Sequence, residues 1–384
     1  PASGNAQAFS VEVTGGTTSF TNGAFATTLY AGTGSPQTIT NGLDLAGDGG
    51  LVWTKSRTNT YNNTTGDTES GTGLYLYTNT TVGHTTPTDA YISAYNSNGY
   101  DIGSVGGGFV AGELGASGQN YVSWAFKKQT KFFDIVTWTG DGVAGGQDLS
   151  HSLGVAPAFI ITKVTSEAGN WNCYSATLGI NKIIKLNNSA AAAEITGFWN
   201  SAPTTTTFNT GGVNEVGRTY VAYLFAHDTA SDSRIQCGSY TGTASSVSIN
   251  LGWQPQWLLI KRSDSAEDWS IVDNVRGMGT DPLLTGLKAL TPNTVSAEEA
   301  PAYSPIVPSS TGFTAYTGYD ARYCANGGTY IYIAIRASTA TDSAITWPSS
   351  VKWPAGVAPT TPVAGTKDLF TFLTTDGGTT YYGK

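Results

Sequence analysis

Hydrophobic and polar residues form one pattern that occurs three times along the chain. A glycine turn leads into a run of β-branched and aromatic residues, which reads GQNYVSWAF at 118–126, GRTYVAYLF at 217–225 and GTYIYIAI at 328–335. This composition is typical of a strand that is buried on at least one face. Because a single strand cannot bury itself, each copy is expected to close its own sandwich or barrel of roughly 100 residues.

A second apolar strand ends in lysine in every copy. Its versions LVWTK, FIITK and WLLIK end at Lys55, Lys163 and Lys261. A third feature is an aromatic residue followed by small polar residues, which recurs every 104 residues (199 − 95 and 303 − 199), at Tyr95, Trp199 and Tyr303. Ordered landmarks at similar spacing indicate a triplicated unit.

These landmarks divide the chain into five predicted segments. They are an N-terminal arm or edge strand (1–23), three β-sandwich repeats (24–128, 132–227 and 234–337) and a C-terminal Trp/Pro segment with a β-hairpin (344–384). The links between repeats are short and polar, so the sandwiches are expected to form a semi-rigid rod. A lone hairpin is marginally stable, so the C-terminal one is expected to pack on the third repeat or on another subunit.

Composition supports an all-β fold. The chain contains 48 Gly and 15 Pro, spread between the aromatic and β-branched runs, where they indicate turns rather than disorder. No apolar run keeps helical spacing over three turns. The predicted fold is therefore three tandem antiparallel β-sandwiches, of jelly-roll or lectin-like type, followed by the C-terminal hairpin.

Charge and cysteine content exclude several classes of function. The net charge is -8 and the 19 basic residues are scattered, so a nucleic-acid partner is not expected. No apolar segment is long enough to span a membrane. The three cysteines, Cys173, Cys237 and Cys324, are too few for a disulfide framework. Cys237 and Cys324 would meet if their strands were neighbours, but buried free thiols are the favoured interpretation.

Together these motifs resemble a family of tandem β-sandwich repeats in virion proteins of tailed bacteriophages, often described as tail-fibre-like. The resemblance covers about residues 24–336, and the closing DGGTTYYG hairpin lies beyond it. It implies an extracellular protein carried on a virion, with lectin-like sandwiches. The implied partners are other virion subunits or copies of the chain itself, with a trimer among the options, and a host surface glycan. The family has no known catalytic residues to transfer.

No catalytic or metal-binding pattern is visible, and no cofactor is predicted. The three histidines, His84, His151 and His227, occupy unrelated positions in the repeat. Adjacent acids such as Glu298 and Glu299 are interpreted as a solvated turn rather than as a pair of glycosidase carboxylates. A polysaccharide depolymerase nevertheless stays open as an alternative.

The Asn-x-Ser/Thr triplets are attributed to chance in a chain so rich in Thr and Asn. They begin at Asn62, Asn63, Asn79 and Asn187.

The best candidate for a ligand surface is a group of aromatic and charged residues in the last loop of the third repeat. The group has no counterpart in the other repeats, and it consists of Tyr316, Tyr319, Asp320, Arg322 and Tyr323. Exposed aromatic rings beside polar groups suit sugars, because a ring covers the apolar face of a pyranose. By contrast, Trp171 and Trp269 recur between repeats and are interpreted as framework. A contact between subunits, or simple loop packing, is the alternative for the tyrosine group.

The sequence therefore favours a non-catalytic structural or attachment protein of a bacteriophage particle: a tail fibre, spike or surface appendage. A secreted or cell-surface carbohydrate-binding adhesin or filament subunit is the main alternative. The expected location is the virion or the extracellular space.

Overall fold

A computed structural model describes residues 7–12, 20–21, 23–86, 90–105, 112–283, 285–337, 351–352, 369–374 and 381–383. Its regular elements in these residues are all strands. The chain divides into two compact units, one formed by residues 19–337 and the other by residues 1–18 and 338–384. We call the first the repeat unit and the second the terminal unit.

Each repeat forms a large antiparallel sheet and a smaller one, as the sequence predicts. In the first repeat the large sheet has the order β2 (Phe20–Thr21), β3 (Phe25–Ala31), β10 (Asn120–Lys127), β5 (Gly50–Ser56), β6 (Thr64–Asp67), β7 (Leu76–Tyr77). Its smaller sheet has the order β4 (Gln37–Thr40), β9 (Gly99–Ser104), β8 (Ala90–Asn96).

The second and third repeats follow the same plan. The second has β11 (Phe133–Thr139), β18 (Thr219–Ala226), β13 (Pro157–Val164), β14 (Trp171–Ser175), β15 (Lys182–Lys185) and β16 (Ala193–Glu194), with β12 (Asp148–Ser150) and β17 (Thr207–Asn209) as the smaller sheet. The third has β19 (Ile235–Thr241), β26 (Thr329–Arg336), β21 (Pro255–Arg262), β22 (Ser270–Asp273) and β23 (Ala289–Leu290), with β20 (Ser246–Asn250), β25 (Gly312–Tyr316) and β24 (Ile306–Ser309). The all-β class and the tandem sandwiches are therefore confirmed.

The strands β10, β18 and β26 are buried on both faces, which explains their continuous apolar runs. In β10, Val122, Trp124 and Phe126 belong to a hydrophobic core that contains residues of all three repeats. Tyr121 and Ala125, which point to the opposite face, belong to a separate core inside the first sandwich. Side chains alternate between the faces of a strand, so one run of residues serves two cores.

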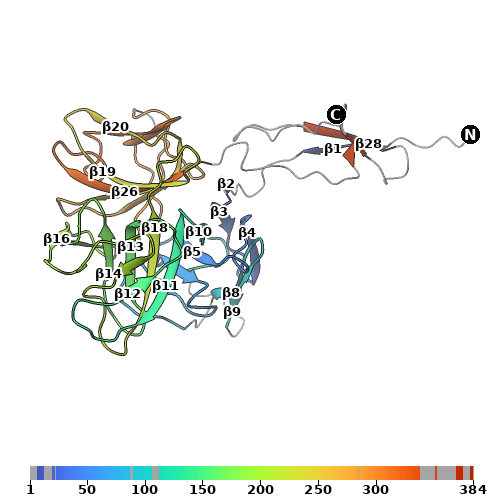
Figure 1. Ribbon diagram of the computed structural model, residues 1–384. Coiled ribbons are helices and arrows are strands. Elements are labelled where there is room, and N and C mark those ends of the chain that lie inside the picture. The colour runs from blue at the N-terminus through green and yellow to red at the C-terminus, as the bar shows by residue number, and fades with distance from the viewer. Residues whose placement is uncertain are drawn as a thin grey trace, which may run out of the picture. The chain divides into compact units, whose positions relative to one another are not determined.

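The shared core makes the expected rod arrangement wrong. Figure 1 shows the sheets that contain β10, β18 and β26 grouped together rather than placed in a row. Short linkers favour neighbouring sandwiches, but they do not decide whether the first also meets the third. The second apolar face of each large sheet decides it, because that face must also be removed from water.

Hydrogen bonds between repeats recur at equivalent positions and close the three repeats into a ring. His84 N donates to Thr165 O (2.7 Å), Ala192 N to Ser263 O (2.8 Å) and Glu298 N to Arg57 O (2.9 Å). The first bond joins the first and second repeats, the second joins the second and third, and the last joins the third back to the first. We name these contacts the 2–1, 3–2 and 1–3 interfaces.

A second set of bonds repeats in the same order. Trp171 Nε1 donates to Tyr77 O (2.9 Å), Trp269 Nε1 to Lys185 O (2.9 Å) and Asn63 Nδ2 to Thr291 O (3.4 Å). Asn63 is eight residues after Lys55, as the two tryptophans are eight residues after their own strand lysines. The ring therefore has approximate threefold symmetry, in which an amide replaces an indole once. Trp171 and Trp269 are buried, which confirms them as framework.

The terminal unit contains one sheet with the order β1 (Gln7–Glu12), β28 (Leu369–Thr374), β29 (Tyr381–Gly383), β27 (Val351–Lys352). The antiparallel pairing of β28 with β29 confirms the two strands of the predicted hairpin, while its turn lies outside the described residues. Strand β28 also pairs with β1, the predicted N-terminal edge strand, so the hairpin is supported by the opposite end of the chain. The free-thiol interpretation is confirmed, because Cys173, Cys237 and Cys324 are all buried and unbridged. No helix in the described residues is long and apolar enough to cross a membrane.

Candidate functional site

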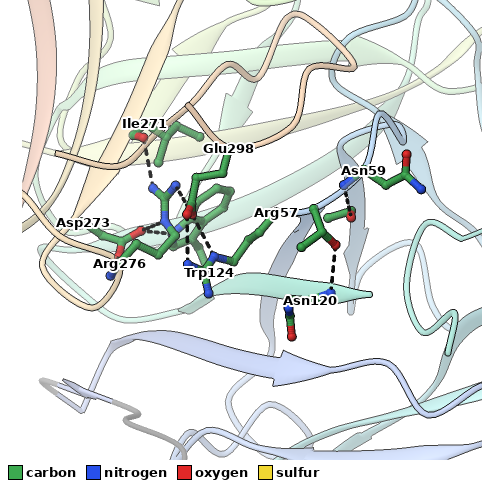
Figure 2. Close-up of polar contacts among 10 residues, drawn as sticks. Arg57, Asn59, Asn120, Trp124, Ile271, Asp273, Arg276 and Glu298 are labelled. Atoms are coloured by element: carbon green, nitrogen blue, oxygen red, sulfur yellow. Dashed lines mark hydrogen bonds and ion pairs between the residues drawn. The ribbon is translucent and has the colours of Figure 1, made fainter. Parts of the chain in front are cut away.

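The 1–3 interface contains a group of charged residues, which Figure 2 shows; Asp273 and Arg276 are buried, while Arg57 and Glu298 are partly buried. Arg57 donates from Nε to Glu298 Oε2 (2.8 Å) and from Nη2 to Oε1 (2.9 Å). Arg276 donates from Nε to Asp273 Oδ2 (2.6 Å), and its Nη1 lies 3.4 Å from Glu298 Oε2. Trp124 Nε1 donates to the same Asp273 oxygen (3.0 Å). We call these five residues the charged seam.

The ends of β5 and β22 position the seam, and Arg57 directly follows β5. Asp273 is the last residue of β22, and the following turn brings Arg276 N to Asp273 Oδ1 (2.9 Å). Arg276 Nη2 reaches Ile271 O (3.0 Å), and the guanidinium carbon lies 5.3 Å from the centre of the Trp124 ring. Each buried charge thus has an opposite charge and further hydrogen bonds, which buried ion pairs require to offset desolvation. The hydrogen bond from Arg57 to Glu298 raises the pKa of Arg57.

The same positions carry different residues at the other two interfaces. Strand register makes Asp67 and Ser175 the equivalents of Asp273, because they face Leu51 and Phe159 as Asp273 faces Trp257. At the 2–1 interface Tyr223 takes the place of Trp124, and its hydroxyl donates to Asp67 Oδ2 (2.8 Å). At the 3–2 interface the carboxylate and its aromatic donor are both absent, since Ser175 and Ile333 occupy the corresponding positions.

The two seam arginines and Glu298 have no charged pair in their place at the other interfaces. At the 2–1 interface the positions of Arg276, Glu298 and Arg57 are occupied by Ser70, His84 and Thr165. At the 3–2 interface the same positions are occupied by Leu178, Ala192 and Ser263. The complete charged seam therefore occurs at one interface, the 2–1 interface keeps a carboxylate alone, and the 3–2 interface has neither charge.

The lysines that end the apolar strands are buried in all three repeats. Lys55 Nζ donates to Tyr61 O (2.7 Å) and to Val295 O (3.0 Å) of the third repeat. Lys163 Nζ donates to Val164 O (2.7 Å) and to Thr81 O (3.1 Å) of the first repeat. Desolvation lowers the pKa of Lys55, Lys163 and Lys261 to about 8. In the first two repeats these lysines thus satisfy carbonyl oxygens at an interface.

The predicted ligand group is only partly brought together at the surface. Tyr323 is fully buried, and its hydroxyl is hydrogen-bonded to Ser270 Oγ (2.6 Å), so it belongs to the core and its assignment as a ligand residue is wrong. Arg322 pairs with Asp320 and with Glu299, both at 2.6 Å from Nη2. Arg322 and Asp320 therefore hold the loop in place through ion pairs.

Tyr319 of this loop and Tyr303, which precedes β24, form an aromatic pair. The rings of Tyr303 and Tyr319 lie 4.9 Å apart at an interplanar angle of 34°. Tyr303 is 48% exposed and Tyr319 is half-buried. Tyr316 is the last residue of β25, and its N–H donates to Pro305 O (2.9 Å). In the sequence Tyr303 is a repeat landmark, and the spacing of landmarks carries no information on the exposure of its ring.

The structure also places Glu298, the three histidines and a surface groove. Glu298 is part of the charged seam, so its interpretation as a solvated turn is wrong. His151 bonds to Thr204 O (3.2 Å), whereas His227 is exposed and His84 lines a small cavity at the 2–1 interface. A polar surface groove of about 690 Å³ lies in the first repeat between Tyr95 and Lys128. Within the described residues no group of three or more His, Cys, Asp or Glu side chains is arranged to hold a metal ion.

A family described as "Domain of unknown function (DUF7483)" matches residues 21–338, which is nearly the whole repeat unit. No curated protein matches the chain.

Proposed function

We propose that this chain, which belongs to the DUF7483 family of domains of unknown function, is a non-catalytic structural or attachment protein of a bacteriophage particle. A tail fibre, a spike or a surface appendage would each fit. The proposal draws on the sequence resemblance to tandem repeats of virion proteins. The observation that carries it is the closed ring, because equivalent hydrogen bonds join all three pairs of repeats and devote buried lysines and charges to assembly.

The proposed location is the virion or the extracellular space, and the proposed partners are other virion subunits or copies of this chain. A trimer is not required to complete the repeat unit, because its three interfaces are closed within one chain. Cyclic closure leaves no repeat interface free. Contacts with other subunits would therefore use surfaces outside these interfaces.

We further propose that the exposed pair Tyr303 and Tyr319 contacts a host surface glycan. The two rings offer apolar faces, while Asp320 and Arg322 supply polar groups close by in the sequence. Because Asp320 and Arg322 are held by each other, their positions are fixed before a ligand arrives. Such preorganisation reduces the entropy lost on binding.

The test of the particle assignment is location. An antibody against the repeat unit should label purified phage particles in electron micrographs, and the chain should co-purify with them at a fixed ratio. A chain found only as a free protein or on bacterial cell surfaces, with saturable glycan binding, would replace the particle assignment with the adhesin alternative.

The glycan contact has its own test. Tyr319→Ala and Tyr303→Ala should each weaken binding to a host polysaccharide without changing the melting temperature, because both rings lie at the surface. Tyr91→Ala on β8 of the first repeat is the matched control and should bind normally. Unchanged binding in both loop variants would remove this surface from consideration.

A further inference from the structure

Three surface hollows adjoin one another where the first and second repeats meet. The largest is the polar groove of about 690 Å³ in the first repeat, and the others have volumes of about 390 and 230 Å³. We call the smaller two the Trp138 hollow and the Ser152 hollow, after residues that line them. The groove shares Glu69 with the Trp138 hollow, and it shares Asp48 and Lys128 with the Ser152 hollow. The shared residues make the three hollows parts of one surface.

Strand β11, at the edge of the large sheet of the second repeat, gives this surface its direction. Its first two residues, Phe133 and Asp134, line the Ser152 hollow, whereas Thr137, Trp138 and Thr139 at its other end line the Trp138 hollow. A strand of this length extends over roughly 20 Å, at about 3.3 Å per residue. Because the groove adjoins both ends, the hollows form an elongated track, which suits a chain-like ligand better than a compact one.

The carboxylates and the ammonium group that line the track are already paired. Lys128 Nζ lies 2.6 Å from Glu69 Oε1 and 3.6 Å from Asp134 Oδ1. Asp48 is paired with Lys127 at 2.9 Å. A charged ligand therefore meets no uncompensated opposite charge here. Glu69 and Lys128 are partly exposed, with 38% and 27% of their side chains accessible, so they can still exchange hydrogen bonds with neutral hydroxyl groups.

Aromatic rings and hydroxyl groups complete the lining of the track. Tyr95, which is half-buried, lines the groove. Trp138 and Tyr220 line the Trp138 hollow, and their rings stack with centres 5.0 Å apart. Each hollow also has an exposed hydroxyl side chain, and these are Thr72, Thr139 and Ser152. Saccharides are recognised by this combination, because the rings contact the apolar face of a pyranose while polar groups bind its hydroxyls.

We propose that the track binds a linear, neutral oligosaccharide, with one sugar unit in each hollow. The choice of ligand rests on the proposed attachment function, but the surface is a different one. The track belongs to the first and second repeats, whereas Tyr303 and Tyr319 belong to the third. The two surfaces can therefore fail separately, and together they would give one chain two contacts with the same polysaccharide.

An array of linear oligosaccharides, from single sugars to hexasaccharides, tests the proposal with the full chain. Neutral and uronic-acid series are compared side by side. Neutral chains of three or more units should bind about tenfold or more tightly than the matching single sugars, because they occupy all three hollows at once. The proposal would be overturned by no binding to any neutral series, by equal binding of single sugars and trisaccharides, or by a preference for uronic-acid chains.

Blocking variants separate the track from the tyrosine pair. Thr72→Trp and Thr139→Trp place an indole in the groove and in the Trp138 hollow, and each should weaken trisaccharide binding about tenfold or more. Their melting temperatures should not change, because both positions are exposed. Thr241→Trp is the matched control and should bind normally, since Thr241 pairs with the first residue of β26 as Thr139 pairs with the first residue of β18.

The same variants show which proposal has failed. Unchanged binding in Thr72→Trp and Thr139→Trp, or an equal loss in Thr241→Trp, would overturn the track. If Tyr303→Ala then abolished binding, the glycan contact of the third repeat would stand alone. Loss of binding in the two track variants, with normal binding in Tyr303→Ala and Tyr319→Ala, would support the track and remove the tyrosine pair.

Discussion

At the scale of single residues, the charged seam shows how one interface became different from the other two. Asp273, Arg276 and Glu298 belong to the third repeat, whereas Arg57 and Trp124 belong to the first. Residues far apart in the sequence thus complete each other's hydrogen bonds. Since every charge of the seam has an opposite charge beside it, the loss of one leaves another uncompensated, which costs more than the pair itself contributes.

Asp273→Ala is predicted to be strongly destabilising. It would leave Arg276, whose side chain is fully buried, without its closest partner, and it would remove the acceptor of Trp124 Nε1. The expected loss in the free energy of unfolding is about 3–5 kcal/mol, measured by urea denaturation. Glu194→Ala, which breaks the exposed pair of Lys182 and Glu194, is the control and should match the wild type. A loss no larger than that of the control would contradict the role assigned to the seam.

Sequence analysis could reach some of these residues and not others. Strand lysines at Lys55, Lys163 and Lys261 were visible because each ends an apolar run. Asn79 and Asn187 were attributed to chance, yet they accept from the N–H groups of Asn63 and Trp171 at equivalent positions (2.8 and 2.9 Å).

Asn293 does the same for Trp269 (3.0 Å). The sequence hides this repeat position because the third repeat carries a longer insertion before the asparagine. Asn293 comes 24 positions after Trp269, whereas Asn187 comes 16 positions after Trp171 (293 − 269 and 187 − 171).

At the scale of elements, the two buried faces of β10, β18 and β26 account for the most informative pattern in the sequence. A half-buried antiparallel strand alternates apolar and polar residues, whereas a strand covered on both sides is continuously apolar. The composition therefore predicted strands correctly. It did not reveal what covers the second face, because a neighbouring repeat and a second subunit impose the same composition.

Phe126→Ala is predicted to destabilise all three repeats together. The Phe126 ring contacts Phe25 of its own repeat, Phe133 and Phe225 of the second repeat and Trp257 of the third, with ring centres 4.9 to 5.6 Å apart. Loss of this ring should cost about 3–5 kcal/mol, seen as a lower melting temperature. Val216→Ala, at a side chain 74% exposed, is the control and should change little.

Amide hydrogen exchange in the Phe126→Ala variant tests whether the three repeats share one core. The amides of β18 and β26 should lose protection together with those of β10. Loss of protection confined to the first repeat would contradict a shared core.

The aromatic landmark illustrates the limit of spacing as a guide. Tyr95 lies in β8 opposite Tyr100, but the residue opposite Phe313 in the third repeat is Pro308, and Tyr303 precedes β24. Equal spacing therefore did not mean equal position, because insertions before and after the landmark compensate. By contrast, the predicted strand positions Tyr100, Phe208 and Phe313 are equivalent, since each pairs with an apolar residue of the first strand in its smaller sheet.

At the scale of the whole molecule, the repeat unit is a closed ring of three sandwiches within one chain. Each repeat contributes one face of its large sheet to the shared core and the same set of hydrogen bonds to its neighbour. The terminal unit brings β1 and β28, from opposite ends of the chain, into one sheet. Linker length and composition could not predict ring closure, because the decisive contact joins the first repeat to the third.

Calorimetric unfolding of the full chain tests this account most directly. A shared core predicts that residues 23–337 unfold in one cooperative transition, with equal calorimetric and van't Hoff enthalpies, and that Asp273→Ala and Phe126→Ala lower the temperature of that same transition. Separate transitions for the repeats, with each variant affecting one of them, would contradict the closed ring.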